Sequence, residues 1–207
     1  MIIERVNIRN YGYVSCKSAF YSAEDGLSEY TQYNFSTGIN RLVGEIDSGN
    51  WAVSYTMSMY KARPKDFILF EKPEAIVNNE PMSFCELCKF SCYMDESYPL
   101  FSSKRSVRNL ITKGLRNSQV GFTVDELKNI FYLDDQRFER PLTQVGNEIF
   151  RSMAAIGVAF GKEIFCFPWL SSRRFQGYHN NLSGLLEILE DLKKIVIVPI
   201  GVENPHR

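Results

Sequence analysis

The sequence has no excess of either charge, no long apolar run and only two histidines. Its 24 Lys and Arg residues balance 24 Asp and Glu residues, so the formal net charge is zero. Proteins that coat nucleic acid carry a basic excess, and we therefore expect no nucleic-acid partner. Short basic groups at Lys104-Arg105, Arg108 and Arg173-Arg174 are interpreted as solvated surface. A neutral chain carries little long-range repulsion, which favours association with itself or with another protein.

The apolar runs are too short to cross a membrane. Runs such as residues 164–167 and 195–200 fall far below the roughly 20 residues that a span needs. The first five residues also lack the basic region and apolar run of a signal peptide. We therefore expect a cytoplasmic protein with no direct membrane insertion.

Five cysteines without a secretion signal are expected to be thiols. Cys85, Cys88 and Cys92 form a C-x2-C-x3-C cluster, a pattern that zinc or an iron–sulfur centre would use. The spacing also places the three on one helical face as small core residues. A zinc site would need a fourth ligand, and the histidines are confined to His179 and His206. We expect no metal, and the role of the cluster stays open.

The hydrophobic pattern predicts an α/β fold. The first forty-five residues have strand character, a strand at 40–44 is expected to be buried, and a helix follows at 52–60. Residues 73–81 are expected to form a turn-rich return. The buried patterns at 163–167 and 195–198 indicate parallel strands, with a helix between them. This predicts a parallel sheet flanked by helices, with an antiparallel β part at the N-terminus.

The length of 207 residues fits one domain. Helical patterns dominate beyond residue 102, where Thr123 is a predicted N-cap, and Ser83 with Glu86 predicts a capping box. We expect about 1–95 and 156–207 to form the α/β core. About 96–155 would then form a small helical subdomain.

Two glycines five residues apart stand between the strand at 40–44 and the helix at 52–60. The segment Gly44-Glu45-Ile46-Asp47-Ser48-Gly49-Asn50-Trp51 matches the P-loop pattern G-x-x-x-x-G-K-[ST] at both glycines. The lysine position holds Asn50 and the hydroxyl position holds Trp51. A glycine-rich turn with positive φ explains the same two glycines.

With this segment and several others, the sequence resembles the nucleotide-binding domain of ATP-binding-cassette (ABC) proteins, in the P-loop NTPase class, over nearly its full length. Residues 93–101 resemble the family's Gln loop, and residues 140–148 stand where its signature should be. Residues 164–167 occupy the Walker B strand. Residues 195–198 occupy the strand before the switch histidine.

The resemblance implies a degenerate site. The P-loop positions, which could still hold an anion through backbone N–H groups and the helix dipole, are Gly44, Glu45, Asp47, Ser48, Gly49, Asn50 and Trp51. The other departures are Asp95 and Glu96 in the Gln loop, Val145, Gly146, Asn147 and Glu148 in the signature, and Pro168 and Trp169 after Walker B. The switch position near Ile200 lacks a histidine. The family's phosphate-binding lysine, Mg²⁺ ligands and catalytic carboxylate are thus all replaced.

These observations leave three functional hypotheses. The first is a catalytically inactive ABC-like protein that acts by association, as a homodimer or with a related cassette or transporter-type protein, as subunit or regulator. It needs no cofactor. The second is a nucleotide-binding subunit with atypical ATP binding, whose substitute groups would come from Asp47, Asp95, Glu96, Glu148 and His179. The third is a binding module for another phosphate-bearing or aromatic ligand, with Tyr11 or Tyr13 in the family's base-stacking position and Trp51 or Trp169 as further rings.

Overall fold

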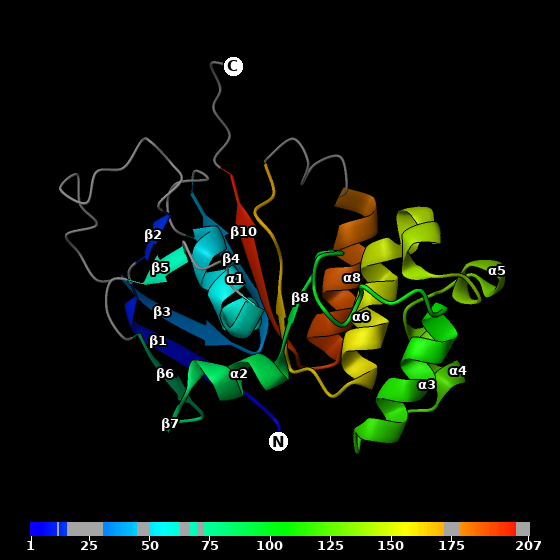
Figure 1. Ribbon diagram of the computed structural model, residues 1–207, viewed down its shortest axis with the longest axis horizontal. Coiled ribbons are helices and arrows are strands. Elements are labelled where there is room, and N and C mark those ends of the chain that lie inside the picture. The colour runs from blue at the N-terminus through cyan, green and yellow to red at the C-terminus, as the bar shows by residue number, and fades with distance from the viewer. Residues whose placement is uncertain are drawn as a thin grey trace.

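The structure is a computed structural model that describes residues 1–11, 13–15, 31–44, 50–62, 67–69, 73–171 and 179–201. Figure 1 shows the β-sheets and helix α1 on one side of the molecule and a group of helices on the other. In the described parts of the chain, no helix is long and apolar enough to cross a membrane.

An antiparallel sheet forms the N-terminal part. Its strand order is β3 (Thr31–Ser36), β1 (Arg5–Tyr11), β6 (Glu74–Val77) and β7 (Glu80–Met82). Alternation along β1 places Val6 and Ile8 in the core. The predicted turn at 73–81 is instead a hairpin of β6 and β7. Asn78 and Asn79, both at positive φ, make its two-residue turn, and asparagine tolerates that backbone region well.

A parallel sheet forms the centre of the molecule. Its strand order is β4 (Gly38–Val43), β10 (Ile195–Ile200), β9 (Ile164–Cys166) and β8 (Ser91–Tyr93). All three pairings are parallel, and β9 is fully buried as predicted. The expected burial of residues 40–44 is wrong, because β4 is the edge strand and its Val43 is 64% exposed. A further small sheet pairs β2 (Tyr13–Ser15) with β5 (Phe67–Leu69).

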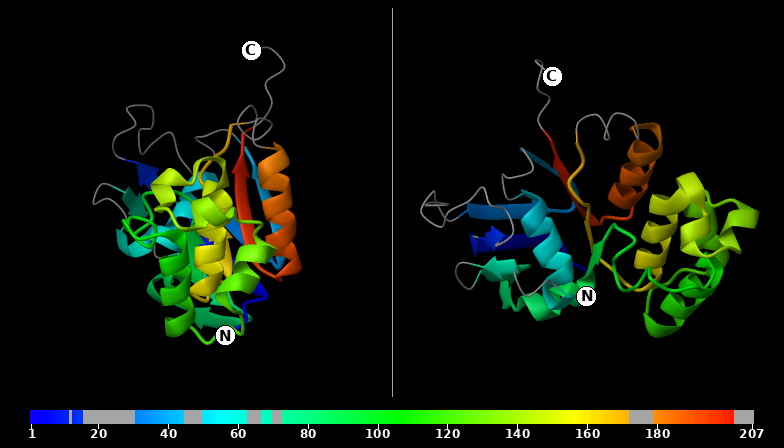
Figure 2. Two further views of the ribbon diagram at one scale, coloured as in Figure 1. Left: turned by 90° about the vertical axis from the view of Figure 1, so that its right-hand side faces the viewer. Right: turned by 45° about the horizontal axis from the view of Figure 1, so that its top comes forward.

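Helices flank the parallel sheet, as the sequence predicts. Helix α1 (Asn50–Met59) packs on β8, β9 and β10, while α8 (His179–Asp191) packs on β4 and β10. Helix α6 (Ile149–Ala159) packs against α8. Figure 2 shows α8 running alongside β10 in both further views. The 3-10 helix η1 (Tyr60–Ala62) continues α1.

Two of the remaining helices begin at the predicted caps. Ser83 caps α2 (Phe84–Phe90) and Thr123 caps α4 (Val124–Ile130), each through a capping box that includes a glutamate three residues on. Helix α3 (Val107–Asn117) packs on α4 and on α5 (Asp135–Phe138), and the 3-10 helices η2 (Leu142–Gln144) and η3 (Gly146–Glu148) pack on α6. Helix α3 packs on α6, which joins this group to the rest of the molecule.

Candidate functional site

The carboxyl ends of the four parallel strands meet at one edge of the sheet, which is where open α/β sheets bind ligands. Gly44 follows β4, and its N–H donates to the carbonyl of Ile200 at the end of β10, at 2.9 Å. Leu170, beyond β9, forms a bridge with Ile200, and its carbonyl accepts from the N–H of Gly201. This edge, at the top of Figure 1, brings the predicted P-loop, Walker B and Gln-loop positions together.

Trp169 links two of these positions directly. Its indole N–H donates to the carbonyl of Gly44 at 3.3 Å, and the side chains of both Pro168 and Trp169 are half-buried. The hydroxyl of Ser54, fully buried on α1, donates to the carbonyl of Phe167 at 2.6 Å. Hydrogen bonds therefore tie the end of β9 to the P-loop-like segment and to α1.

Asn50 and Trp51 form the start of α1. The hydroxyl of Tyr33 lies 3.5 Å from Oδ1 of Asn50, a long hydrogen bond. Trp51 is half-buried, and its ring meets Tyr55 edge-on with centroids 6.1 Å apart. Tyr55 in turn meets the ring of Tyr93 at 5.3 Å. An aromatic row therefore runs from the start of α1 to the end of β8.

The two acids at the Gln-loop position have different surroundings. Asp95 is half-buried, and its Oδ1 accepts from the N–H and hydroxyl of Ser97 at 2.9 and 2.6 Å. Burial, with a smaller contribution from the charge of Asp95, raises the pKa of Tyr55 and that of Tyr93. Glu96 is exposed. Asp95 is thus the acid that adjoins the aromatic row.

The signature-like residues have polar partners from the helical segment. Arg137 forms an ion pair with Glu148 at 2.9 Å and also hydrogen-bonds Oδ1 of Asn147. The second carboxylate oxygen of Glu148 accepts from the N–H of Asp134 at 3.1 Å. Val145 is buried, and Gly146 has a φ of +60°, which favours glycine. In Figure 1 the start of α6, which follows these residues, lies toward the same side as the carboxyl edge of the sheet.

Several predicted site residues lie outside the described residues. These are Glu45, Asp47, Ser48 and Gly49 of the P-loop-like segment. Tyr11 ends β1 and Tyr13 begins β2, and His179 begins α8. For these three residues the structure describes the backbone alone.

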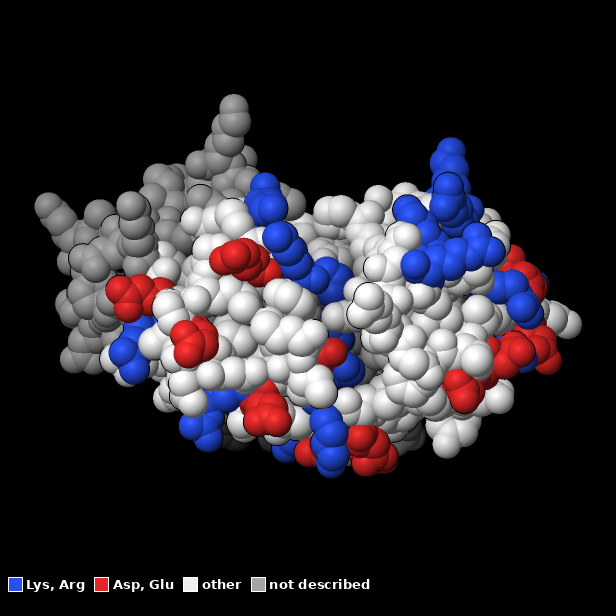
Figure 3. Space-filling view, turned by 90° about the horizontal axis from the view of Figure 1, so that it is seen from below, with Lys and Arg blue, Asp and Glu red and all other residues white. Residues whose placement is uncertain are grey.

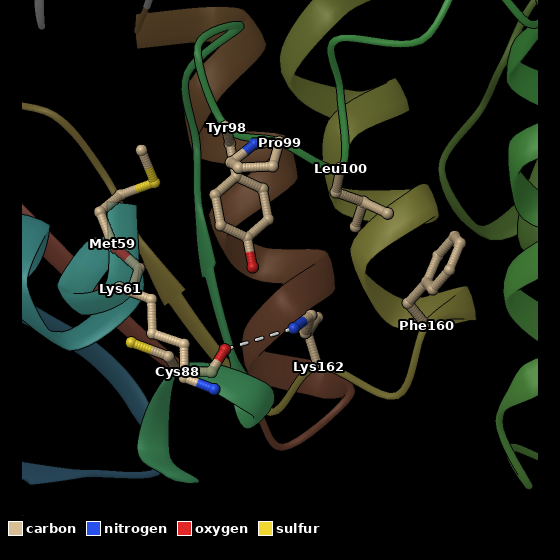
Figure 4. Close-up of a pocket in the computed structure, with 9 residues that line it drawn as sticks. Met59, Lys61, Cys88, Tyr98, Pro99, Leu100, Phe160 and Lys162 are labelled. Carbon is tan, nitrogen blue, oxygen red and sulfur yellow. Dashed lines mark hydrogen bonds between the residues drawn. The ribbon is translucent and has the colours of Figure 1, made fainter. Parts of the chain in front are cut away.

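Sequence reasoning missed a pocket of about 370 Å³ where α1, α2, the segment after β8 and the end of α6 meet (Figure 4). Its lining is mostly apolar and consists of Ser58, Met59, Lys61, Cys88, Tyr98, Pro99, Leu100, Phe160 and Lys162. The Lys162 ammonium donates to the carbonyls of Lys89 at 2.7 Å and Cys88 at 3.4 Å, and burial lowers its pKa. No local motif signals this pocket, because its residues come from four separate segments.

The prediction of one helical face for the cysteine cluster is wrong. Helix α2 ends at Phe90, so Cys92 lies in β8, where it is fully buried. Cys85 is exposed, and Cys88 lines the pocket. Burial raises the pKa of the Cys92 thiol to about 12. Within the part of the chain that the structure describes, no group of three or more His, Cys, Asp or Glu side chains could hold a metal ion.

The architecture is that of the nucleotide-binding domains of ABC transporters. The structure is similar to an ABC transporter ATP-binding protein of Pyrococcus furiosus, with a TM-score of 0.64, 17% identity, and coverage of 98% of this chain and 94% of that one. It is also similar to CbiO1 of Clostridium perfringens, part of the ABC transporter complex CbiONQ (TM-score 0.58, 13% identity, 98% and 79% covered).

A bacterial Atm1-family ABC exporter with ATP bound is similar too, with a TM-score of 0.57 and 10% identity, over 99% of this chain and 35% of that one. At these identities the likeness establishes the fold. The sequence matches no protein-family model and no curated protein.

Proposed function

We propose that this protein is a non-hydrolysing ABC-like subunit that acts by association with another protein, as part or regulator of a transporter-like assembly. The observation that carries the proposal is the carboxyl edge of the parallel sheet. There Trp169 donates a hydrogen bond to the carbonyl of Gly44, and Pro168 and Trp169 follow the strand that would supply the family's carboxylates. A hydrogen bond within the protein therefore joins the segment after β9 to the residue that follows β4.

The residues at this edge do not fit a Mg²⁺–nucleotide complex. Mg²⁺ prefers oxygen ligands, and an indole at Trp51 supplies none. Asn50 brings no positive charge to offset a triphosphate. Glu148, the acid of the signature-like segment, is already paired with Arg137. Loss of charge stabilisation and of metal-assisted chemistry each lowers a rate by orders of magnitude.

Association is supported by the fold and by the pocket. Structural neighbours include an exporter and a subunit of a transporter complex, and we extend their association, not their nucleotide use, to this chain. The pocket of Figure 4 offers an apolar recess on the surface, edged by Lys61 and Lys162. Within the ABC family two domains dock head to tail, so a second copy of this chain is the first partner to test.

Two measurements test the proposal. Phosphate release with Mg²⁺-ATP and Mg²⁺-GTP is expected to stay at background. Light scattering at micromolar concentration is expected to show a dimer, or a monomer that forms a stoichiometric complex when co-purified with a related cassette. Turnover that disappears in a Glu148→Ala or Asp95→Ala variant would contradict the catalytic half. A strict monomer without any stoichiometric partner would contradict the associative half.

A further inference from the structure

An unusually long stretch of this neutral chain carries only one sign of charge. Residues 97–124 contain no Asp or Glu. They contain five cations, namely Lys104, Arg105, Arg108, Lys113 and Arg116. Because the whole chain has a net charge of zero, the remaining residues carry a net charge of −5 (0 − 5). The molecule therefore has a concentrated basic region that its overall charge conceals.

The fold places most of these cations along one groove. The groove, about 560 Å³ in volume, is lined by Arg105, Asn109, Thr112, Lys113, Arg116 and Asn117. Spacings of three and four residues put such side chains on one face of α3. In Figure 3 the Lys and Arg side chains gather over this helix, at the upper right. We call this feature the α3 groove.

Among the described residues, the groove cations Arg105, Lys113 and Arg116 lack the carboxylate partner that several other cations of the helical segment have. Arg108 pairs with Glu139, Lys128 with Asp135, and Arg137 with Glu148. By contrast, none of the three groove cations forms an ion pair within the part of the chain that the structure describes, and all three are exposed. Their charge is available to an external anion.

We propose that the α3 groove binds an acidic peptide segment of a partner protein. Arginine pairs with carboxylates in a two-pronged geometry, and the amides of Asn109 and Asn117 can donate to and accept from a peptide backbone. Along α3, from Asn109 to Asn117, the groove spans roughly 12 Å at the helical rise of about 1.5 Å per residue. That length accommodates about four residues of extended peptide.

The lining favours a peptide over the other polyanions. The groove has no aromatic side chain on which bases of single-stranded nucleic acid would stack. It has no large apolar side chain that would enter a membrane interface, and its concave shape suits an inserted segment better than a flat lipid surface. The inference goes beyond the proposed function, because it does not depend on whether the sheet edge binds nucleotide.

Fluorescence anisotropy with a labelled six-glutamate peptide at low salt tests the inference, with a six-glutamine peptide as the neutral probe. The double variant Lys113→Gln with Arg116→Gln removes two groove charges while keeping good helix formers. The matched control, Lys89→Gln with Lys193→Gln, removes two exposed charges outside the groove. Because the substituted side chains are exposed, we expect all variants to fold. The single variant Arg105→Gln provides a second test at a groove residue that precedes α3.

We expect the glutamate peptide to bind the wild-type protein in preference to the glutamine peptide, and added salt to weaken that binding. The groove double variant should lose about tenfold in affinity, the result of losing charge-assisted contacts, and the control about twofold or less. Equal binding of the two peptides, or equal losses in the two double variants, would overturn the proposal. So would tighter binding of a thymidine oligonucleotide, or of phosphatidylserine-containing vesicles, than of the glutamate peptide.

Discussion

At the scale of single residues, the decisive feature is what stands at the end of β9. In ABC proteins the corresponding strand leads into carboxylates that organise Mg²⁺ and activate water. Here it leads into Pro168 and Trp169, and the indole of Trp169 turns a hydrogen-bond donor toward Gly44. The position that holds a catalytic carboxylate in that family thus holds a side chain that stabilises the fold here.

Replacement of Trp169 by phenylalanine should make this contribution measurable. Trp169→Phe keeps an aromatic ring but removes the N–H that donates to Gly44. We expect the free energy of unfolding in urea to fall by about 1–2 kcal/mol, from the lost hydrogen bond and the smaller ring. Tyr132→Phe, at a side chain 71% exposed, is the control and should change it by less than about 0.5 kcal/mol. An unchanged unfolding free energy in Trp169→Phe would show that the bond is dispensable.

Buried thiols and phenols give the protein a second residue-scale property, sensitivity to alkaline pH. Burial raises the pKa of Cys92 to about 12 from 9.0, and burial likewise raises the pKa of Tyr98 above 10.0. The unfolded chain releases these protons first, so at high pH it binds fewer protons than the folded chain. The stability that these two groups contribute is therefore fully present below about pH 9 and is lost as the pH rises above it.

A Tyr98→Phe variant isolates one of these groups. The Tyr98 hydroxyl donates to the carbonyl of Ser91 at 2.9 Å, so its loss should cost about 1 kcal/mol at pH 7. Above pH 10 the variant no longer loses stability through this phenol, so its deficit relative to the wild type should shrink. Urea unfolding at pH 7, 9 and 10.5 under reducing conditions measures the difference. A deficit that stays constant or grows with pH would contradict this account.

At the scale of helices and strands, the sequence predicted the helix caps correctly, because each capping box depends on neighbouring residues alone. The capping boxes at Ser83 and Thr123 need only residues within one turn, and both form. Strand β4 is exposed because it is the edge strand, and Cys92 lies in β8 because α2 ends at Phe90. Neither feature can be predicted from a short stretch of sequence. The hairpin at 74–82 was missed because its prolines and asparagines resemble a plain turn. The pocket around Lys162 has no sequence signal.

The α3–α6 contact gives an element-scale prediction through a glycine. A Cβ atom added at Gly114 would lie 2.8 Å from the backbone of Ala159 and 2.7 Å from the Phe160 ring. We expect Gly114→Ala to lower stability by about 1–3 kcal/mol through overpacking, despite alanine's better helix propensity. Gly184→Ala in α8, where the nearest atom is 3.6 Å away, is the matched control and should raise stability by up to about 1 kcal/mol. A shift of the unfolding temperature in the same direction in both variants would contradict the view that Gly114 is needed for the close packing of α3 on α6.

At the scale of the whole molecule, the sequence predicted the architecture. The strand order β4-β10-β9-β8 further places the ends of these four strands at one sheet edge, which the order of motifs along the chain did not state. The division into an α/β core (1–95 and 156–207) and a helical subdomain (96–155) remains our proposal. What the sequence could not supply is how the edge is held together, since the Trp169–Gly44 bond spans 125 residues.

We propose that protein groups, rather than a bound nucleotide, organise the carboxyl edge of the parallel sheet. Thermal unfolding across a series of Mg²⁺-ATP concentrations up to the millimolar range distinguishes the two. A ligand that binds the folded state raises its stability by about 2.7 kcal/mol at a hundred times its Kd. We predict no change in the unfolding temperature at any ATP concentration. A rise that increases with ATP and follows a single binding constant would contradict the claim.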